Sequence, residues 1–157
     1  MKQRTTLLKG TTLIIGMIVL TLSIFWLPSL ASDAARMNPG YAYLQFPVLI
    51  GLYVTTIPFF LALSEAWKLL NDIEKKNAFS ERAVMSLARI KVYAIAILLL
   101  YVLGMLILTF LHALHPGILA LGLIIIFATV IFALFASLLQ ELLRSVMEIK
   151  LENDLTV

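Results

Sequence analysis

Four apolar, nearly charge-free stretches occupy most of the chain, and each is about long enough to cross a lipid bilayer. We expect the spans at residues 11–31, 46–66, 92–112 and 117–140. About 20 apolar helical residues cover a hydrocarbon core of roughly 30 Å. A helix also satisfies its own backbone hydrogen bonds where water is absent. The sequence therefore predicts an all-α polytopic membrane protein with four transmembrane helices in an antiparallel bundle.

The composition agrees with this class and excludes several kinds of chemistry. The chain is 62% hydrophobic and 13% charged, against about 45–50% and about 25% in soluble domains. It contains no cysteine, which excludes disulfides and thiolate chemistry. His112 and His115 have no third metal ligand near them in sequence, and no catalytic or phosphate-binding motif is present. We expect no metal, no cofactor and no enzymatic activity.

The first span has two interpretations. Lys2, Arg4 and Lys9 precede an apolar stretch that ends near Ser29 to Ala31, a pattern that also fits a cleaved signal peptide. The apolar stretch is longer than the usual h-region of about 7–15 residues, so a retained helix is favoured. Residues 32–43 then predict a short loop.

The second span contains Pro58, which leaves the carbonyl of Val54 without its usual partner. We expect a helix kink at Pro58, with Thr55 and Thr56 positioned to relieve the missing bond. Glu65 lies one turn inside the end of this span. It is either a carboxylate used in ion coupling or, as we favour, a boundary residue paired with Lys68.

A polar hairpin at residues 67–91 is the only long interruption of the apolar sequence. Ser80 is suited to cap a helix that continues into the third span, with Ala83, Leu87 and Ile90 on one face. The fourth helix is too long for the bilayer, so residues 141–157 should form a helix end and tail in water. An apolar stripe on that end consists of Leu139, Leu142, Val146 and Ile149. Gly16, Gly104 and Gly122 are expected to allow close helix packing.

The distribution of basic residues predicts the orientation. Of the 12 lysines and arginines, only Arg36 lies between the first two spans; the others lie before the first span, in the hairpin or after the fourth span. Basic residues in short loops favour the cytoplasmic side. Both termini and the hairpin should therefore be cytoplasmic, in a multi-pass protein of the bacterial plasma membrane.

The hairpin sequence Asn77-Ala78-Phe79-Ser80 and the ending Glu-Asn-Asp-Leu-Thr-Val resemble the YoaS-like family of bacterial membrane proteins (domain of unknown function 2975). Ala78 stands where the family commonly has proline. Members are often encoded beside a small helix-turn-helix regulator, so the resemblance implies that the protein binds such a regulator at the membrane. The residues that match the family motifs, and that we expect to bind this partner, are Asn77, Phe79, Ser80, Glu152, Asn153, Asp154, Leu155 and Thr156.

The sequence thus predicts a regulatory interaction protein whose hairpin and tail contact a partner. Besides the lipid bilayer and the regulator, a second copy of the chain is a possible partner. Direct nucleic-acid binding is not expected, because acidic residues interrupt the basic cluster of the hairpin. The alternative is a small transporter or immunity-type protein that binds a lipid or peptide inside the bundle around Pro58.

Overall fold

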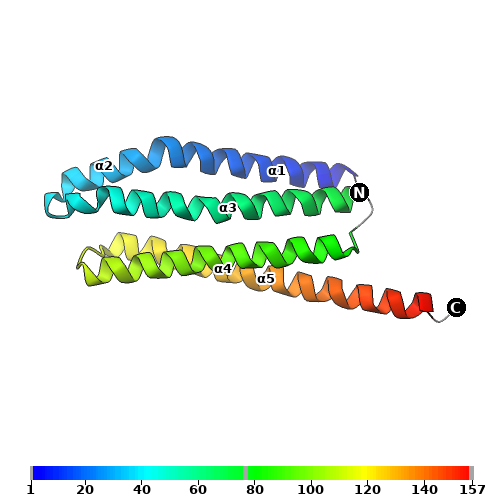
Figure 1. The fold of residues 1–157 in the computed structure, drawn as a ribbon. Helices are drawn as coiled ribbons and strands as arrows, with labels where there is room; N and C mark the ends of the chain where they lie inside the picture. Colours follow the sequence, from blue (N-terminus) through cyan, green and yellow to red (C-terminus); the bar gives the residue numbers. More distant parts are fainter. Residues whose placement is uncertain (1, 76–77, 156–157) are drawn as a thin grey trace.

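The computed structural model describes residues 2–75 and 78–155, with side chains described from Arg4 onward, and this part of the chain contains helices and no strand. Figure 1 shows the helices lying side by side. The elements in chain order are α1 (Lys2–Thr21), the π-helical turn η1 (Leu22–Trp26), α2 (Leu27–Met37), the 3-10 helix η2 (Pro39–Leu44), α3 (Gln45–Glu74), α4 (Glu81–Phe110) and α5 (Pro116–Leu155).

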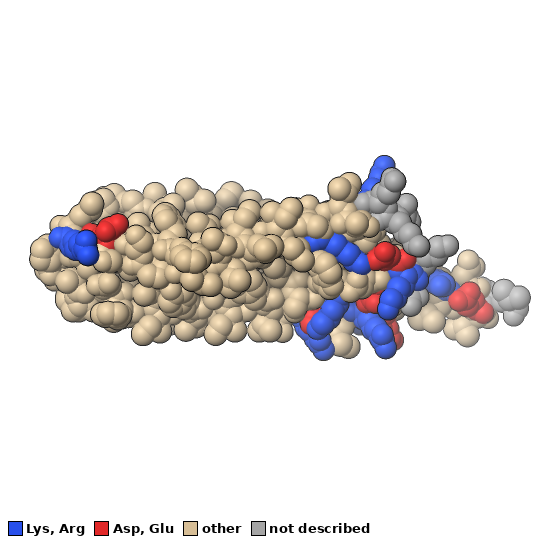
Figure 2. Space-filling model, turned by 90° about the horizontal axis from the view of Figure 1, so that it is seen from above, with Lys and Arg blue, Asp and Glu red and all other residues tan. Residues whose placement is uncertain are grey.

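The helices pack in the order of the chain. α1 contacts α3, α3 contacts α4, and α4 contacts α5. Because successive helices run antiparallel, both termini and the α3–α4 connection lie at one end of the molecule (Figure 1). Most lysine, arginine, aspartate and glutamate side chains gather at this end (Figure 2), which we call the charged end. α2, η2 and the α4–α5 turn form the opposite end.

The structure confirms the predicted fold class. Four helical segments are long and apolar enough to cross a membrane, at residues 4–37, 39–74, 81–110 and 116–155. Large apolar side chains such as Phe25, Ile57, Leu99 and Phe127 are exposed along them. In water such a surface would be unfavourable, whereas lipid chains are as apolar as these side chains.

The expectation of a loop at residues 32–43 was wrong. The helix continues past Pro28 as far as Met37, and the 3-10 helix η2 follows almost at once. The π-helical turn η1 makes this possible: the N–H of Leu27 bonds to the carbonyl of Leu22, five residues back. The carbonyl of Ser23 would next bond to Pro28, which has no N–H. The hydroxyl of Tyr53 on α3 donates to that carbonyl instead, at 3.0 Å.

Pro58 does not interrupt α3, which is one continuous α-helix across this position and runs without a sharp bend in the view of Figure 1. The kink at Pro58 stays a prediction, whereas the threonine hydroxyls differ from what the sequence predicted. Thr55 donates to the carbonyl of Leu52 and Thr56 to that of Tyr53, both at 2.6 Å. Neither of these bonds reaches the carbonyl of Val54. The π-helical turn within the described helices is η1, at Leu22–Trp26.

Two of the three glycines expected at helix contacts are found there. A Cβ atom on Gly16 would lie 2.8 Å from Leu63 Cδ2 on α3, and one on Gly122 would lie 2.5 Å from Met105 Sδ on α4. The prediction for Gly104 was wrong, because a Cβ atom there would meet nothing within 4 Å. Gly16 and Gly122 therefore permit the α1–α3 and α4–α5 contacts.

These contacts predict different effects for the same substitution on two neighbouring helices. Gly122→Val should lower the thermal stability of the detergent-solubilised protein, since overpacking costs about 1–3 kcal/mol. Gly104→Val is the matched control and should change the melting temperature little. Equal melting temperatures for the two variants would contradict the α4–α5 packing described here.

Candidate functional site

The most buried part of the molecule lies where α4 begins, at the charged end. Ala83, Leu87 and Ile90, which the sequence placed on one face, are all buried, and Ala94 continues the same face. The α4 helix begins at a well-formed cap, in which the Ser80 hydroxyl accepts a hydrogen bond from the N–H of Ala83 at 3.3 Å. This cap satisfies a backbone donor that would otherwise lack a helical partner.

A buried carboxylate joins α3 to α4 in this region. The side chain of Glu65 is only 5% exposed. Its Oε1 atom accepts from Lys68 Nζ at 2.7 Å and from Arg89 Nη1 at 3.3 Å. Its Oε2 atom accepts from the hydroxyl of Ser86 at 3.0 Å. We call these four residues the Glu65 cluster.

The Glu65 cluster meets the energetic demand of burying a charge. A buried carboxylate is tolerated when it is paired and hydrogen-bonded, and Glu65 has two cationic partners and one hydroxyl. Pairing with Lys68 was predicted from the sequence, but Ser86 and Arg89 were not. The sequence did contain a signal for Ser86, because this polar residue lies on the same helical face as the apolar residues Ala83, Leu87 and Ile90.

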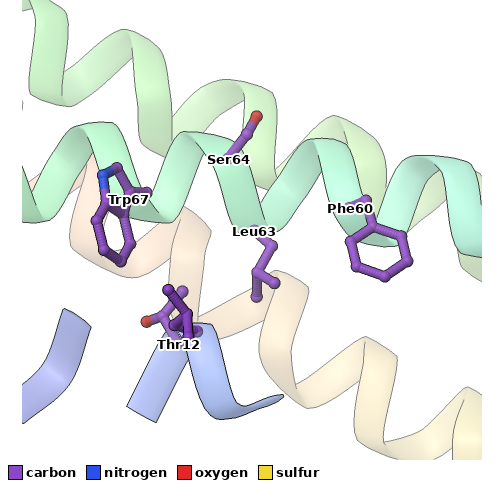
Figure 3. Close-up of a pocket in the computed structure, with 6 residues that line it drawn as sticks. Thr12, Phe60, Leu63, Ser64 and Trp67 are labelled. Carbon is purple, nitrogen blue, oxygen red and sulfur yellow. The ribbon is translucent and has the colours of Figure 1, made fainter. Parts of the chain in front are cut away.

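A second polar contact ties the N-terminal helix to the bundle. Lys9 on α1 forms an ion pair with Glu74 at the end of α3, and its ammonium nitrogen lies 5.8 Å from the centroid of the Trp67 ring. A shallow groove of about 230 Å³ lies between α1 and α3 beside this contact. Figure 3 shows Leu63 and Trp67 of α3 directed toward Thr12 of α1.

Two shallow grooves between the helices are not lined by Pro58. The first groove is lined by Thr12, Leu13, Phe60, Leu63, Ser64 and Trp67. The second has a volume of about 210 Å³ and lies between α4 and α5 near the opposite end. Pro58 itself is buried. A ligand site centred on Pro58 stays a prediction.

The end of α5 is an exposed amphipathic helix. Lys91 on α4 donates to Gln140 on α5 at 3.2 Å. Because Lys91 is two residues from Arg89 on α4, Gln140 lies close to the Glu65 cluster along the long axis of the bundle. Beyond Gln140, α5 continues past the start of α4 (Figure 1). Leu142, Val146 and Ile149 are 55%, 43% and 64% exposed there, and we call these three residues the α5 stripe.

The predicted helix end and tail are helical as far as Leu155, where α5 ends. Glu152, Asn153, Asp154 and Leu155 are exposed on its last turns, and Thr156 lies outside the described residues. The helix persists because residues 141–155 contain no proline or glycine and include the i,i+4 pair of Arg144 and Glu148, at 3.5 Å.

The structure does not unite the predicted partner-binding residues in one compact site. Phe79 is exposed at the α3–α4 connection, whereas the Ser80 hydroxyl is used as the helix cap. Asn77 lies outside the described residues. The last turns of α5 lie beyond and apart from this connection (Figure 1). A partner that contacts both the α3–α4 connection and the last turns of α5 would have to span the distance between them.

The two histidines shape the α4–α5 turn. The ring Nδ1 of His115 accepts from the N–H of Gly117 at 3.2 Å in the first turn of α5. His112 has a positive φ of 54°, and its carbonyl accepts from the hydroxyl of Tyr41 at 2.9 Å. No group of three or more possible metal ligands occurs among the described residues.

These features define a polytopic helical membrane protein with a closed α3–α4 contact and an exposed helix end at the charged end. Residues 29–157 match the family described as "Protein of unknown function (DUF2975)", and the chain belongs to that family. It is 43% identical over 158 residues to the uncharacterized membrane protein YoaS of Bacillus subtilis (strain 168), covering 99% of each chain. No solved structure matches it.

The Glu65 cluster predicts an asymmetric response to substitution. The double variant Lys68→Ala, Arg89→Ala leaves a buried carboxylate without a cation, a change that typically costs about 3–5 kcal/mol. Because both cations are half-exposed, we expect the lower part of this range. Glu65→Gln keeps the shape and leaves only solvated cations, so it should destabilise the protein less. Thermal unfolding in detergent tests this order, and the reverse order would contradict it.

Proposed function

We propose that this protein is a membrane-anchored regulatory interaction protein and not an enzyme. In this proposal the charged end faces the cytoplasm of a bacterial cell. The end of α5 and the α3–α4 connection bind a small helix-turn-helix regulator and keep it at the membrane. The regulator, and not the membrane protein, would contact DNA.

The distribution of charge supports the cytoplasmic orientation. Eleven of the 12 lysines and arginines belong to the N-terminal segment, the hairpin or the end of α5, and only Arg36 belongs to the opposite end. Such an excess is typical of cytoplasmic loops. The contacts of Lys9 with Glu74 and of Gly16 with Leu63 support a retained first span over a cleaved signal peptide, because α1 completes the packing surface of α3.

The α5 stripe is the observation that carries the proposed interaction. The Glu65 cluster and the Lys91–Gln140 bond lie where charges first appear on the helices. Residues beyond Gln140 therefore extend out of the hydrocarbon, where lipid chains no longer cover Leu142, Val146 and Ile149. An amphipathic helix with i, i+4 and i+7 apolar positions is a common form of protein recognition.

The identity of the partner rests on the family resemblance. Members of the YoaS-like family are often encoded beside a small helix-turn-helix regulator. The basic residues of the hairpin alternate with Asp72, Glu74 and Glu81, which argues against direct binding of the membrane protein to DNA. A protein partner fits the mixed charged and apolar character of the α5 end better.

The orientation can be tested by cysteine labelling, because the natural chain contains no cysteine. Phe79 and Tyr43 are exposed at the charged end and the opposite end, respectively. A membrane-impermeant maleimide should label Tyr43→Cys in intact cells and label Phe79→Cys only after lysis. Labelling of Phe79→Cys in intact cells, with Tyr43→Cys protected, would reverse the orientation.

The interaction can be tested by co-purification of the tagged protein from its host, followed by mass spectrometry. With the wild type we expect a stoichiometric helix-turn-helix protein to co-purify. Most of this regulator should be lost with the double variant Leu142→Ser, Ile149→Ser, and likewise with deletion of residues 152–157. Glu148→Ser, on the polar face of the same helix, is the control and should retain the regulator. Equal recovery from all variants, or no such protein with the wild type, would refute the proposal.

A further inference from the structure

The Glu65 cluster has two half-exposed cations around one buried anion. The side chains of Lys68 and Arg89 are 57% and 52% exposed, against 5% for Glu65. With one carboxylate and two cations, the cluster carries an excess positive charge. Because both cations bond to the same oxygen atom of Glu65, they lie close enough together to contact a single phosphate group.

Both cations retain donors that the protein does not use in this cluster. A lysine ammonium has three N–H donors and an arginine guanidinium has five. Lys68 donates to Glu65, and Arg89 donates to Glu65 and to the sulfur of Met85. The remaining donors can bind an external anion, and phosphate oxygens suit both kinds of cation.

The surroundings place the Glu65 cluster at the depth of lipid phosphates. One turn deeper toward the opposite end, the exposed side chains are apolar: Leu61 on α3 and Val92 on α4. One or two turns further out, the side chains are charged, with Asp72 on α3 and Arg82 on α4. A cationic group at such a boundary faces the headgroup layer of the bilayer.

We propose that Lys68 and Arg89 form a binding site for the phosphate of an anionic phospholipid, oriented by the buried carboxylate of Glu65. The hydroxyl of Ser86 fixes the carboxylate, and the carboxylate in turn fixes the two cations. Their side chains are thus partly ordered before the lipid arrives, which lowers the entropy cost of binding. The proposal of this site does not rest on the proposed regulator or on the proposed cytoplasmic orientation of the charged end.

The test measures phospholipid binding to the purified full-length protein in mild detergent by native mass spectrometry. Phosphatidylglycerol should bind more tightly than phosphatidylcholine. Lys68→Gln should weaken phosphatidylglycerol binding about fivefold, the effect typical of one basic residue near an anionic membrane. Lys150→Gln, which removes an exposed lysine from α5, is the matched control and should leave it unchanged.

Glu65→Gln separates a lipid site from a purely structural ion pair. Glutamine keeps a side-chain oxygen that can accept from Lys68 and Arg89 and so retains their orientation, but it removes the negative charge. The variant should therefore bind phosphatidylglycerol more tightly, whereas a cluster with only a structural role would show no gain. If Glu65→Gln does not fold, the comparison of Lys68→Gln with Lys150→Gln decides.

Besides the absence of a gain in Glu65→Gln, three results would overturn the proposal. These are equal binding of the two lipids, equal losses in Lys68→Gln and Lys150→Gln, or full displacement of the lipid by millimolar inorganic phosphate. The last result would assign the site to a free anion.

Discussion

The pairing of the buried Glu65 carboxylate is the interaction on which the arrangement of the charged end depends. Burial of a carboxylate without partners would be strongly unfavourable, so α3 and α4 must bring Lys68, Ser86 and Arg89 together around it. This requirement fixes the register of the two helices where they leave the bilayer. The small residues Ala83 and Ala94 then allow close contact, and they are among the least exposed side chains in the protein.

The two sides of the charged end consequently differ. On the α3–α4 side, the Glu65 carboxylate is paired inside the chain and the apolar face of α4 is buried. On the α5 side, Leu142, Val146 and Ile149 remain exposed beyond Gln140, which accepts a hydrogen bond from Lys91 of α4. In the function that we propose, this uncovered amphipathic helix recruits the partner beside the buried α3–α4 contact.

The sequence was sufficient for features governed by local physics. Apolar length predicted four spanning helices, and capping chemistry predicted the role of Ser80. It failed where a distant residue decides the outcome. The helix through Pro28 depends on Tyr53, which bonds to the carbonyl of Ser23, thirty residues earlier in the chain. Arg89 and Ser86 meet Glu65 only through the packing of α3 on α4. Gly104 of α4 faces open space, whereas Gly122 of α5 packs against Met105 of α4.

Hydrogen–deuterium exchange of the protein in lipid nanodiscs directly tests the difference between the buried start of α4 and the exposed end of α5. Slow exchange reports backbone that is hydrogen-bonded within a stable, well-packed unit. We expect slow exchange at residues 83–94 of α4 and fast exchange at residues 142–155 of α5 in the isolated protein. Strong protection of residues 142–155 without any added partner would contradict it, because the α5 stripe would then be covered already.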